Sequence, residues 1–502
     1  MKKIAIIGAG WSGLACAQAL KQAEERGGEA TEVWLFEASP YAGGRARGIA
    51  WETALGKTAI DNGQHLLLGA YSQTWQFLKD SGVLVHQAWS NAALQWASYS
   101  PNRPAPYALL RVPPQAWPWR FLGQSFPNAT NPAIAQPWGF LSRLSLANVL
   151  RHAIRSDWQV KGTALNWLKP IAMPKEVRQR FWRPLIEGAL NTDWAEASAY
   201  VFLQVVKDSL CGLSGSSNCW HPSTDLSQSA IEPVVLWLKR HDTKVITRCR
   251  ISAITPVVPS NNSSARQHFW HLQAHPSSQD QALALGLETQ VFATVVLATP
   301  AYEANRLWRQ SKLQETPAIQ RAGTLDWRGV MTLYIHLNRA QAGLLAPMSQ
   351  WLCSLPGLHG RAHIGLARTP SQNGSQVVSL VGSGLMKDDD RSILADSLWR
   401  AAAHYLKPLG VSDLKSLPYR ITDDPRATWA CTATLTDEET FTKEASTSSV
   451  EYSLTGIEGL LRAADDLTPG YPACIEAAVR SGQACAQIIK GRQVPLKDAL
   501  LQ

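Results

Sequence analysis

The sequence predicts an α/β protein with a second, mixed α+β domain inserted into it. An apolar run at residues 3–7 leads directly into a glycine-rich turn at residues 8–13, and residues 14–25 have the pattern of a helix. A second apolar run, at residues 33–36, ends in Glu37. Strand, glycine turn, helix, strand and acid in this order are typical of a Rossmann-like unit that binds a dinucleotide.

Each residue of this first turn has a physical role in that interpretation. Gly8 allows a tight turn, Gly10 lets backbone amides approach a pyrophosphate, and Gly13 lets the helix pack close to the strand. Ser12 lies where the unpaired N–H groups of the helix N-terminus attract phosphate. Glu37 follows at close to the usual spacing of about 20 residues and would accept hydrogen bonds from a ribose. The alternative is a glycine-rich turn with a structural role only.

A second glycine turn follows Glu37 directly. Gly43 and Gly44 keep side chains away from a long anionic ligand, and Arg45 would neutralise part of the pyrophosphate charge. The alternative is a surface turn with a solvated arginine. Two successive turns at which the backbone can come close to a ligand favour a cofactor that is longer and more anionic than a mononucleotide.

The composition excludes several classes of protein. The chain has 502 residues, a net charge of +9 and 17% charged residues, but we find no run of basic residues and no nucleic-acid motif, so DNA or RNA is not expected as a partner. The eight cysteines form no CxxC pair, which predicts reduced, mostly buried thiols and no metal site. The first strand starts almost at Met1, which leaves no room for a signal peptide, so we expect a cytoplasmic protein.

Tryptophan is unusually abundant. The chain contains 21 Trp, a residue that favours apolar pockets with a polar rim and membrane interfaces. With few charges and a positive balance, this indicates a large apolar ligand and peripheral contact with the cytoplasmic face of a membrane. The alternative is ordinary core and surface tryptophan. No uninterrupted apolar stretch of about 18 residues exists, so a membrane-spanning helix is not expected.

Further segments predict that the nucleotide-binding part is discontinuous. Residues 229–240 have a helical pattern, and residues 244–247 and 250–254 read as strands, with Ile251 as a candidate cofactor contact. An antiparallel meander is expected next, and residues 294–300 should return the chain beside the first strand. Elsewhere we expect strands at 330–337, 360–367 and 377–382, and a helix at 391–405 behind the acidic residues 388–390.

The C-terminal part should complete the cofactor site. Residues 459–465 read as a strand that ends in Asp465, which we prefer to Asp466 because it follows the strand directly. Pro472 lies at or just before the first turn of a helix at 474–489, where a missing N–H costs little. The expected domains are therefore a nucleotide-binding domain at 1–90, 218–300 and 426–495, a substrate-binding domain at 91–217 and 301–425, and a tail at 496–502.

The two glycine turns with Glu37 between them resemble the superfamily of FAD-dependent amine oxidases and phytoene desaturases. This resemblance implies a two-domain fold of the glutathione reductase type and FAD as the cofactor. It also implies that an acid such as Asp465 binds near the ribityl phosphate, and that the next helix directs its N-terminus at the flavin. Ala464 departs from the glycine that is usual there. Covalent attachment at Cys474 is weighed against a small buried thiol, and we expect non-covalent FAD.

A narrower resemblance covers nearly the whole chain. Residues 60–71, which contain Asp61-Asn62-Gly63-Gln64-His65, are similar to hydroxysqualene dehydroxylases, the squalene-associated flavoproteins of bacterial hopanoid synthesis. Other matching stretches are residues 182–192, 197–210, 222–227 and 470–482. The resemblance implies a reductive reaction in which a C30 isoprenoid alcohol, hydroxysqualene, loses its hydroxyl, gains a hydride and becomes squalene.

Four residues are candidates for the chemistry beside the flavin. Gln64 and His65 would lie next to the ring, Asp61 would orient His65, and Tyr471 would flank the flavin from the C-terminal side. Gly63 and Gln64 are also candidate cofactor contacts. The alternative is that Asp61 only shapes a turn, that Gln64 hydrogen-bonds the flavin, and that His65 and Tyr471 are packed side chains.

Other functions remain open at this point. A second flavin enzyme, either a polyene desaturase or an amine oxidase, has the same glycine turns. A prenyl-chain escort protein without flavin chemistry is a third hypothesis, although a degraded second turn or a lost C-terminal acid would be expected for it. The electron donor is either free NAD(P)H or a partner protein, and no oligomeric state is predicted.

Overall fold

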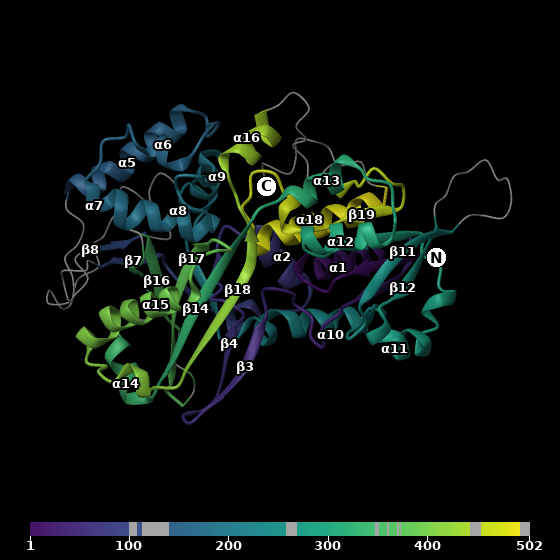
Figure 1. Ribbon diagram of the computed structural model, residues 1–502, viewed down its shortest axis with the longest axis horizontal. Helices are drawn as coiled ribbons and strands as arrows, with labels where there is room; N and C mark the ends of the chain where they lie inside the picture. The colour runs from purple at the N-terminus through teal and green to yellow at the C-terminus, as the bar shows by residue number, and fades with distance from the viewer. Residues whose placement is uncertain are drawn as a thin grey trace.

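The structure is a computed structural model that describes residues 1–99, 108–112, 140–257, 269–346, 351–358, 361–368, 371, 373–441 and 453–491. Within these residues the chain forms two main sheets and a helical layer beside the second sheet (Figure 1). The predicted tail at 496–502 lies outside the described residues.

The first sheet is parallel throughout and has the strand order β10-β2-β1-β13-β19. Its strands are β1 (Lys2–Ile7), β2 (Thr31–Phe36), β10 (Lys244–Ile246), β13 (Thr294–Leu297) and β19 (Leu460–Arg462). The prediction that residues 294–300 return beside the first strand is confirmed, because Ile7 lies opposite Leu297. The ends of β1, β2, β13 and β19 therefore lie at one edge, where ligands of such sheets bind.

Helix α1 (Trp11–Glu25) begins three residues earlier than its sequence pattern suggests, with extended Gly10 as its N-cap. It packs tightly onto the strand before it, since a Cβ added to Gly13 would lie 2.0 Å from the Gly8 carbonyl oxygen. Helix α18 (Ile475–Ile489) packs against α1 and covers the same face of the sheet (Figure 1). Two helix N-termini thus lie near the same edge of the parallel sheet.

The predicted antiparallel meander is a two-stranded hairpin in the described residues, formed by β11 (Ile251–Val257) and β12 (Phe269–Ala274). Helix α12 (Ala301–Gln310) contacts β11 and α13 (Pro317–Thr324). The remaining helices of this region are α2 (Ser72–Asp80), α3 (Val85–Ala88), α10 (Glu232–Arg240) and α11 (Gln279–Ala284). A π-helical turn, η2 (Ser227–Ile231), precedes α10 and occupies the start of the predicted helix at 229–240.

The second sheet has seven strands in the order β18-β14-β17-β16-β15-β7-β8, and only β15 and β7 are parallel neighbours. Its strands are β7 (Gln95–Ser98), β8 (Ala108–Arg111), β14 (Trp327–Leu337), β15 (Leu352–Pro356), β16 (Ala362–Ala367), β17 (Gln376–Leu385) and β18 (Tyr419–Trp429). Edge strand β18 crosses the predicted domain boundary at residue 425, because the chain stays paired with β14 as far as Trp429.

Helix α15 (Arg391–Leu406) packs against this sheet, and the Asp390 carboxylate caps it by accepting from the amides of Ser392 and Ile393. The acidic start predicted from the sequence is therefore a true N-cap. Helix α14 (Arg339–Leu345) follows β14, and α16 (Ala433–Phe441) follows β18.

A layer of helices lies beyond the β7 and β16 side of the sheet (Figure 1). It consists of α5 (Phe140–Arg155), α6 (Ala164–Leu168), α7 (Lys175–Val177), the π-helical η1 (Arg178–Trp182), α8 (Arg183–Leu190) and α9 (Ala199–Leu210). Two small sheets join the main ones: β3 (Gly48–Thr53) with β4 (Gly56–Asp61), and β9 (Cys219–Pro222) between β5 (Leu67–Leu68) and β6 (Trp89–Ala92).

The prediction of mostly buried thiols is confirmed, because six of the eight cysteines are buried, and all eight are free in the structure. Among the helices of the described residues, none is long and apolar enough to cross a bilayer.

Candidate active site

A cavity of about 450 Å³, here called the glycine-turn cavity, opens at the strand ends of the parallel sheet. Of the thirteen residues that the sequence analysis assigns to the cofactor, nine line it: Gly8, Gly10, Ser12, Glu37, Gly43, Gly44, Arg45, Ile251 and Asp465. They come from segments at both ends of the chain and, for Ile251, from its middle. The parallel sheet brings them together because the chain returns to the same edge at β13 and β19.

The two glycine turns touch each other at the floor of this cavity. Gly10 and Gly43 form an isolated parallel bridge, and Gly44 has a left-handed backbone with φ +63°. A Cβ added to Gly44 would lie 3.2 Å from the Gly10 Cα atom. A ligand is thereby offered a surface of backbone atoms at the N-terminus of α1, which no side chain caps.

Glu37 is held rigidly at the end of β2. Its Oε2 atom accepts a hydrogen bond from the Ala9 amide at 3.0 Å, and its Oε1 atom accepts from the Ser39 amide at 2.8 Å. Each carboxylate oxygen has a second lone pair, so both can still accept from a ribose. The geometry supports the role that the sequence spacing predicts.

Arg45 is not a solvated surface arginine. Its guanidinium donates to the Asp465 carboxylate at 2.7 Å and to the Ala427 carbonyl oxygen at 2.6 Å. Burial lowers the pKa of Arg45, but Asp465 overcomes this and the net pKa is raised. The pair links the second glycine turn to the C-terminal segment, with both side chains in the cavity wall.

The preference for Asp465 over Asp466 agrees with the structure. Asp466 is fully buried and binds Arg462 at 3.1 Å and Arg321 at 3.0 Å, which together hold the pKa of its carboxyl below the usual range against the effect of burial. Asp466 is therefore a structural residue, whereas Asp465 faces the cavity.

Two buried polar atoms in the wall of this cavity lack a partner among the described residues, namely Arg47 Nε and Thr299 Oγ1. Buried polar atoms are rarely left unpaired, so their presence is an observation that favours a polar ligand. Backbone amides, a fixed carboxylate and unpaired donors are the groups that a pyrophosphate and a ribose need. The residues present therefore fit a dinucleotide cofactor.

A second cavity, of about 350 Å³ and here called the apolar cavity, lies between the helical layer and the seven-stranded sheet. Its wall includes apolar side chains from α8, α9, β7, β15, β16 and β17, among them Trp96, Leu185, Val206, Leu352 and Leu366. Five residues line both cavities: His65, Thr428, Ala473, Cys474 and Ile475. The two cavities therefore meet at the N-terminus of α18.

Cys474 occupies this junction as the N-cap of α18, and its Sγ atom accepts from the Ala477 amide at 3.5 Å. Burial raises the pKa of the Cys474 thiol to about 12, with smaller opposing effects from its hydrogen bonds. A thiol that stays protonated is a poor nucleophile. This chemistry favours a cofactor that is bound without a covalent link to Cys474.

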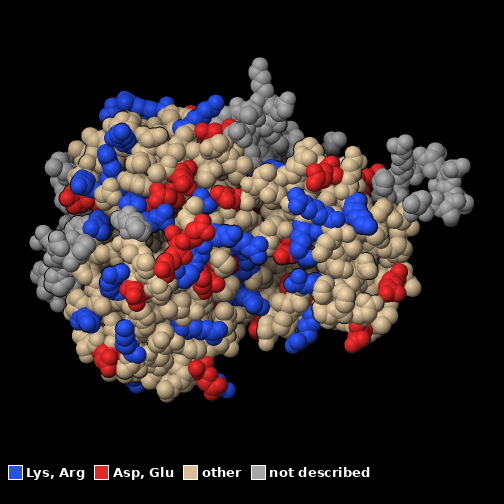
Figure 2. All heavy atoms as spheres, viewed as in Figure 1, with Lys and Arg blue, Asp and Glu red and all other residues tan. Residues whose placement is uncertain are grey.

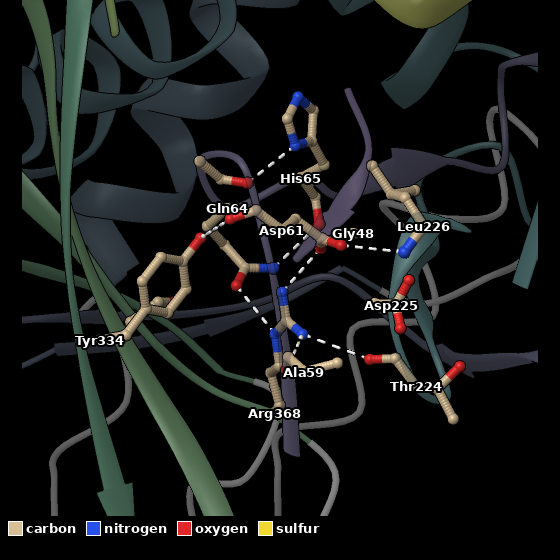
Figure 3. A network of polar contacts seen from close by, with 12 residues as sticks. Gly48, Ala59, Asp61, Gln64, His65, Thr224, Asp225, Leu226, Tyr334 and Arg368 are labelled. Atoms are coloured by element: carbon tan, nitrogen blue, oxygen red, sulfur yellow. Dashed lines mark hydrogen bonds and ion pairs between the residues drawn. The ribbon is translucent and has the colours of Figure 1, made fainter. Parts of the chain in front are cut away.

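A buried network positions the segment that carries Gln64 and His65 (Figure 3). Asp61, at the end of β4, has no exposed surface and binds Arg368 with 2.6 Å between Oδ2 and the guanidinium. Its Oδ1 atom accepts from the Leu226 amide at 2.9 Å, and its carbonyl oxygen accepts from the Tyr334 hydroxyl at 3.0 Å. One carboxylate thus ties together β4, the chain after β16, and the start of η2.

The same arginine reaches the predicted site residues, since Arg368 donates from Nε to Gln64 Oε1 at 3.0 Å. Gln64 in turn donates to the His65 carbonyl oxygen at 2.9 Å, and His65 Nδ1 is 2.8 Å from the Gly63 carbonyl oxygen. Figure 3 shows the imidazole pointing away from Arg368. The network therefore fixes the backbone of this segment and leaves the His65 ring at the junction of the cavities.

The sequence interpretation of Asp61 as the group that orients His65 needs a correction. The ring is oriented by the Gly63 carbonyl, whereas the Asp61 carboxylate pairs with Arg368. A carbonyl only accepts, so Nδ1 carries the proton and Nε2 of the neutral ring is an acceptor. Burial lowers the pKa of His65 more strongly than Asp61 and Gly63 raise it, so the neutral ring is favoured.

Four predicted cofactor residues lie elsewhere. Gly13 packs under the first turn, and the Gly63 carbonyl holds His65. Gln64 and Pro472 line the apolar cavity, as does the candidate catalytic residue Tyr471. All four lie outside the described wall of the glycine-turn cavity, although Ser12, His65 and Ala473, which are close to them in sequence, line it.

Sequence reasoning missed two charged residues of this region. Arg368 follows an apolar strand that gives no hint of its partner Asp61, which is 307 positions away. Asp208 lies in the wall of the apolar cavity and accepts a hydrogen bond from the Tyr471 hydroxyl at 3.0 Å. The available signal for Asp208 was an acid near the end of a helix whose other residues are mostly apolar. No cluster of metal-ligating side chains occurs within the described residues.

Comparison with known proteins agrees with this geometry. The model of the family described as flavin containing amine oxidoreductase matches residues 11–490. The chain belongs to this family. Two proteins named hydroxysqualene dehydroxylase are each 26% identical to it: one from Rhodopseudomonas palustris, over 97% of this chain and 98% of that protein, and one from Zymomonas mobilis, over 96% and 98%.

Solved structures show the same fold at low sequence identity. Cyclohexylamine oxidase from Brevibacterium oxydans superposes with a TM-score of 0.61 at 14% identity, covering 98% of this chain and 99% of that one. An oxidoreductase from Methanosarcina mazei has a TM-score of 0.61 at 13% identity, covering 96% and 99%. The predicted α/β fold with a Rossmann-like FAD-binding domain is confirmed. The protein is an FAD-dependent oxidoreductase, and its similarity to hydroxysqualene dehydroxylases, predicted from the sequence, is confirmed as well.

Proposed function

We propose that this flavoenzyme removes the hydroxyl of hydroxysqualene reductively and releases squalene. The observation that carries the proposal is the apolar cavity that shares a wall with the glycine-turn cavity at His65, Cys474 and Ile475. A C30 isoprenoid has almost no polar surface, so its binding needs an apolar enclosure beside the cofactor. The two relatives of the same name, aligned over nearly the full chain, support the choice of substrate.

The reaction exchanges a C–O bond for a C–H bond. An allylic hydroxyl leaves as water once its oxygen is protonated, and the carbon then accepts a hydride. Bound FAD, in its reduced form, supplies that hydride. The chain's own residues would exclude water and stabilise positive charge on the substrate: aromatic rings of Tyr71, Trp96, Phe181 and Tyr471 lie in the cavity wall, and such rings attract cations.

An anaerobic single-turnover experiment tests the proposal. The purified protein is reduced with dithionite, mixed with hydroxysqualene, and followed by the flavin absorbance and by mass spectrometry of the extracted lipid. Reoxidised flavin together with one squalene per flavin is the expected result. Flavin that stays reduced in the presence of hydroxysqualene would overturn the proposal.

The alternatives from the sequence give different outcomes in the same assay. A polyene desaturase would instead reduce oxidised flavin when given a C30 or C40 polyene, and an amine oxidase would do so when given an amine. An escort protein would bind the prenyl chain without any flavin band in the visible spectrum. The electron donor stays a prediction, and reduction of the flavin by NADPH or NADH under anaerobic conditions measures it.

We also propose that the protein contacts an anionic membrane surface through α5–α7. Exposed Leu144 and Ile154 lie on α5. The exposed cations of this segment are Arg151, Arg155, Lys161, Lys169 and Lys175, against the exposed acids Asp157 and Glu176. Figure 2 shows basic side chains gathered at the edge of the molecule where Figure 1 places α5 and α6. Each cation near an anionic bilayer contributes about 1 kcal/mol.

Co-sedimentation with vesicles tests this contact. We expect binding to phosphatidylglycerol vesicles that weakens with salt, and little binding to phosphatidylcholine vesicles. The double variant Arg151→Glu with Arg155→Glu should lose most of the binding. The control, Lys239→Glu with Arg240→Glu on α10, makes the same charge change elsewhere. Equal losses in both double variants would overturn the placement on α5–α7.

A further inference from the structure

The apolar cavity contains a carboxylic acid whose presence its apolar character does not explain. Asp208 lies near the C-terminal end of α9, and among the described residues that line this cavity it is the sole carboxylic acid. Its neighbours along the helix, Val205 and Val206, also line the cavity. An acid that only needed solvation would lie on the exposed side of the helix, where Lys207 lies.

Asp208 is held in a defined orientation. The Tyr471 hydroxyl donates to its Oδ2 atom at 3.0 Å, and Arg480 lies over the Tyr471 ring, 4.8 Å from the ring centre. Arg480 is itself bound to Glu476 at 2.8 Å, so its charge is already balanced. The Asp208 carboxyl thus lies in the cavity wall with Oδ2 hydrogen-bonded, and Tyr471 is placed to fix the plane of the group.

The surroundings raise the pKa of the Asp208 carboxyl. Burial raises the pKa of its carboxyl, and the Glu476 charge raises it further. The Tyr471 hydrogen bond and the charges of Arg480 and Lys207 lower it, but they do not reverse the rise. Burial also raises the pKa of Tyr471, so the phenol stays a neutral donor.

The other ionisable groups of the cavity are poorly suited to donate a proton. His65 is neutral and presents an acceptor nitrogen, as described above. Burial raises the pKa of the Tyr71 hydroxyl and raises the pKa of the Cys219 and Cys474 thiols to about 12. A group donates effectively when its pKa lies near the working pH, and these three groups hold their protons too strongly.

We propose that Asp208 is the acid that protonates the departing hydroxyl, with Tyr471 as its positioning residue. This inference rests on the proposed function. In the step, the C–O bond breaks, its electron pair stays on oxygen, and the Asp208 proton converts the leaving group to water. The carbon is left as an allylic cation and accepts the hydride, with both electrons, from reduced flavin. Asp208 ends as a carboxylate and regains its proton from solvent.

The test compares Asp208→Asn with wild-type holoenzyme in the anaerobic single turnover. Asparagine keeps the shape and can still accept from Tyr471, but it cannot donate the proton. General acid catalysis contributes about 10²–10⁴-fold, so we expect flavin reoxidation by hydroxysqualene to slow by that factor. The wild-type rate should fall as pH rises through the raised pKa of Asp208, and the variant should lack this dependence.

A second readout does not depend on turnover. Infrared spectra of the oxidised holoenzyme with squalene bound should contain the C=O stretch of a protonated carboxylic acid, and Asp208→Asn should remove one such band. Squalene affinity, followed through the flavin spectrum, should change little. In Tyr471→Phe the loss of the hydrogen bond that lowers the Asp208 pKa should move the alkaline limb of the pH profile to higher pH.

Asp280→Asn, an exposed acid on α11, is the matched control and should behave as wild type. If wild type and Asp208→Asn reoxidise equally fast, the proposal for Asp208 is overturned while the proposed function stands. If the Asp208→Asn rate falls but no infrared band is lost and the pH profile is unchanged, the residue is structural and the proposal is also overturned. If wild-type flavin is not reoxidised at all, the proposed function fails and this inference fails with it.

Discussion

The glycine-turn cavity has at its floor two glycine turns that lie close together in the sequence, whereas the apolar cavity is lined by side chains from segments far apart in the sequence. In the first, Gly10, Gly43 and Gly44 bring main-chain groups to the ligand, and one side chain, Glu37, is fixed by two amides. In the second, α8, α9 and several strands contribute apolar side chains. Recognition of the common cofactor thus depends on local backbone geometry, and recognition of the substrate depends on the long-range packing of the whole chain.

The largest effect is expected at the buried pair of Asp61 and Arg368, which holds the segment that carries His65 at the junction of the cavities. Arg368→Met would leave the fully buried Asp61 carboxylate without its partner, which costs about 3–5 kcal/mol of the free energy of unfolding. Urea denaturation of the FAD-saturated protein measures it. Arg391→Met breaks a more exposed pair with Asp423 and should cost at most about 1 kcal/mol. Equal costs would show that the junction does not depend on the buried pair.

Acid should lower the free energy of unfolding through His221 on β9. The two ring nitrogens of this side chain are buried and lack partners among the described residues. Burial lowers the pKa of His221 to about 4, with a smaller effect from Arg368, from an ordinary value of about 6.5. The unfolded chain therefore binds the proton first, so stability is lost as pH falls from about 6.5 to 4. The loss at pH 4 is about 3 kcal/mol.

Between pH 6.5 and 4, the variant His221→Leu should lose about 3 kcal/mol less of its free energy of unfolding than wild type does. Thermal or urea unfolding at several pH values measures the slope. His152→Leu, on the exposed side of α5, should leave the slope as it is in wild type. An unchanged slope in His221→Leu would contradict the assignment.

Gly13→Ala tests the glycine-turn side. The added methyl would lie 2.0 Å from the Gly8 carbonyl oxygen, a backbone atom that cannot move without shifting the first turn. We expect a loss in the upper part of the usual range for overpacking, about 1–3 kcal/mol, together with weaker FAD binding. In Gly343→Ala, on exposed α14, no atom lies within 4 Å of the methyl, and a gain of about 0.5–1 kcal/mol is expected. FAD titration and urea unfolding distinguish the two.

Glu37→Gln should have the smallest effect and should be confined to the cofactor. The amide keeps the size of the side chain but halves its acceptors, so one amide bond or one ribose contact weakens. About 1.4 kcal/mol, or a tenfold rise in the dissociation constant for FAD, is expected. Fluorescence titration of the apoprotein measures it, with Glu29→Gln, an exposed acid, as the control. A variant that binds FAD as tightly as wild type would remove the ribose role of Glu37.

The same contrast explains what the sequence could predict. Gly8, Gly10, Glu37, Gly43 and Gly44 lie within forty residues, so their spacing alone places them at one strand edge. Their assignment needed no knowledge of the rest of the fold. Asp465 lies in the cavity wall, three residues after the end of β19, whereas the adjacent Asp466 pairs with two buried arginines.

The chemistry at the junction was harder to predict, because it depends on pairs that the chain brings together over long distances. Asp61 was singled out, but its partner Arg368 was not, and the role assigned to Asp61 changed as a result. Tyr471 and Asp208 are 263 positions apart, and only their hydrogen bond reveals them as a unit. The tautomer of His65 likewise follows from a carbonyl whose direction the sequence does not encode.

Five residues belong to both cavity walls, and one of them, Thr428 on β18, accepts a hydrogen bond from Asn191 at the end of α8 at 2.8 Å. A ligand in one cavity therefore contacts residues that also line the other cavity. By thermodynamic linkage, a lipid that binds more tightly when flavin is present must tighten the hold on flavin by the same factor. Protein purified without the lipid should therefore release its flavin, and lose the yellow flavin absorbance, faster than protein purified with the lipid bound.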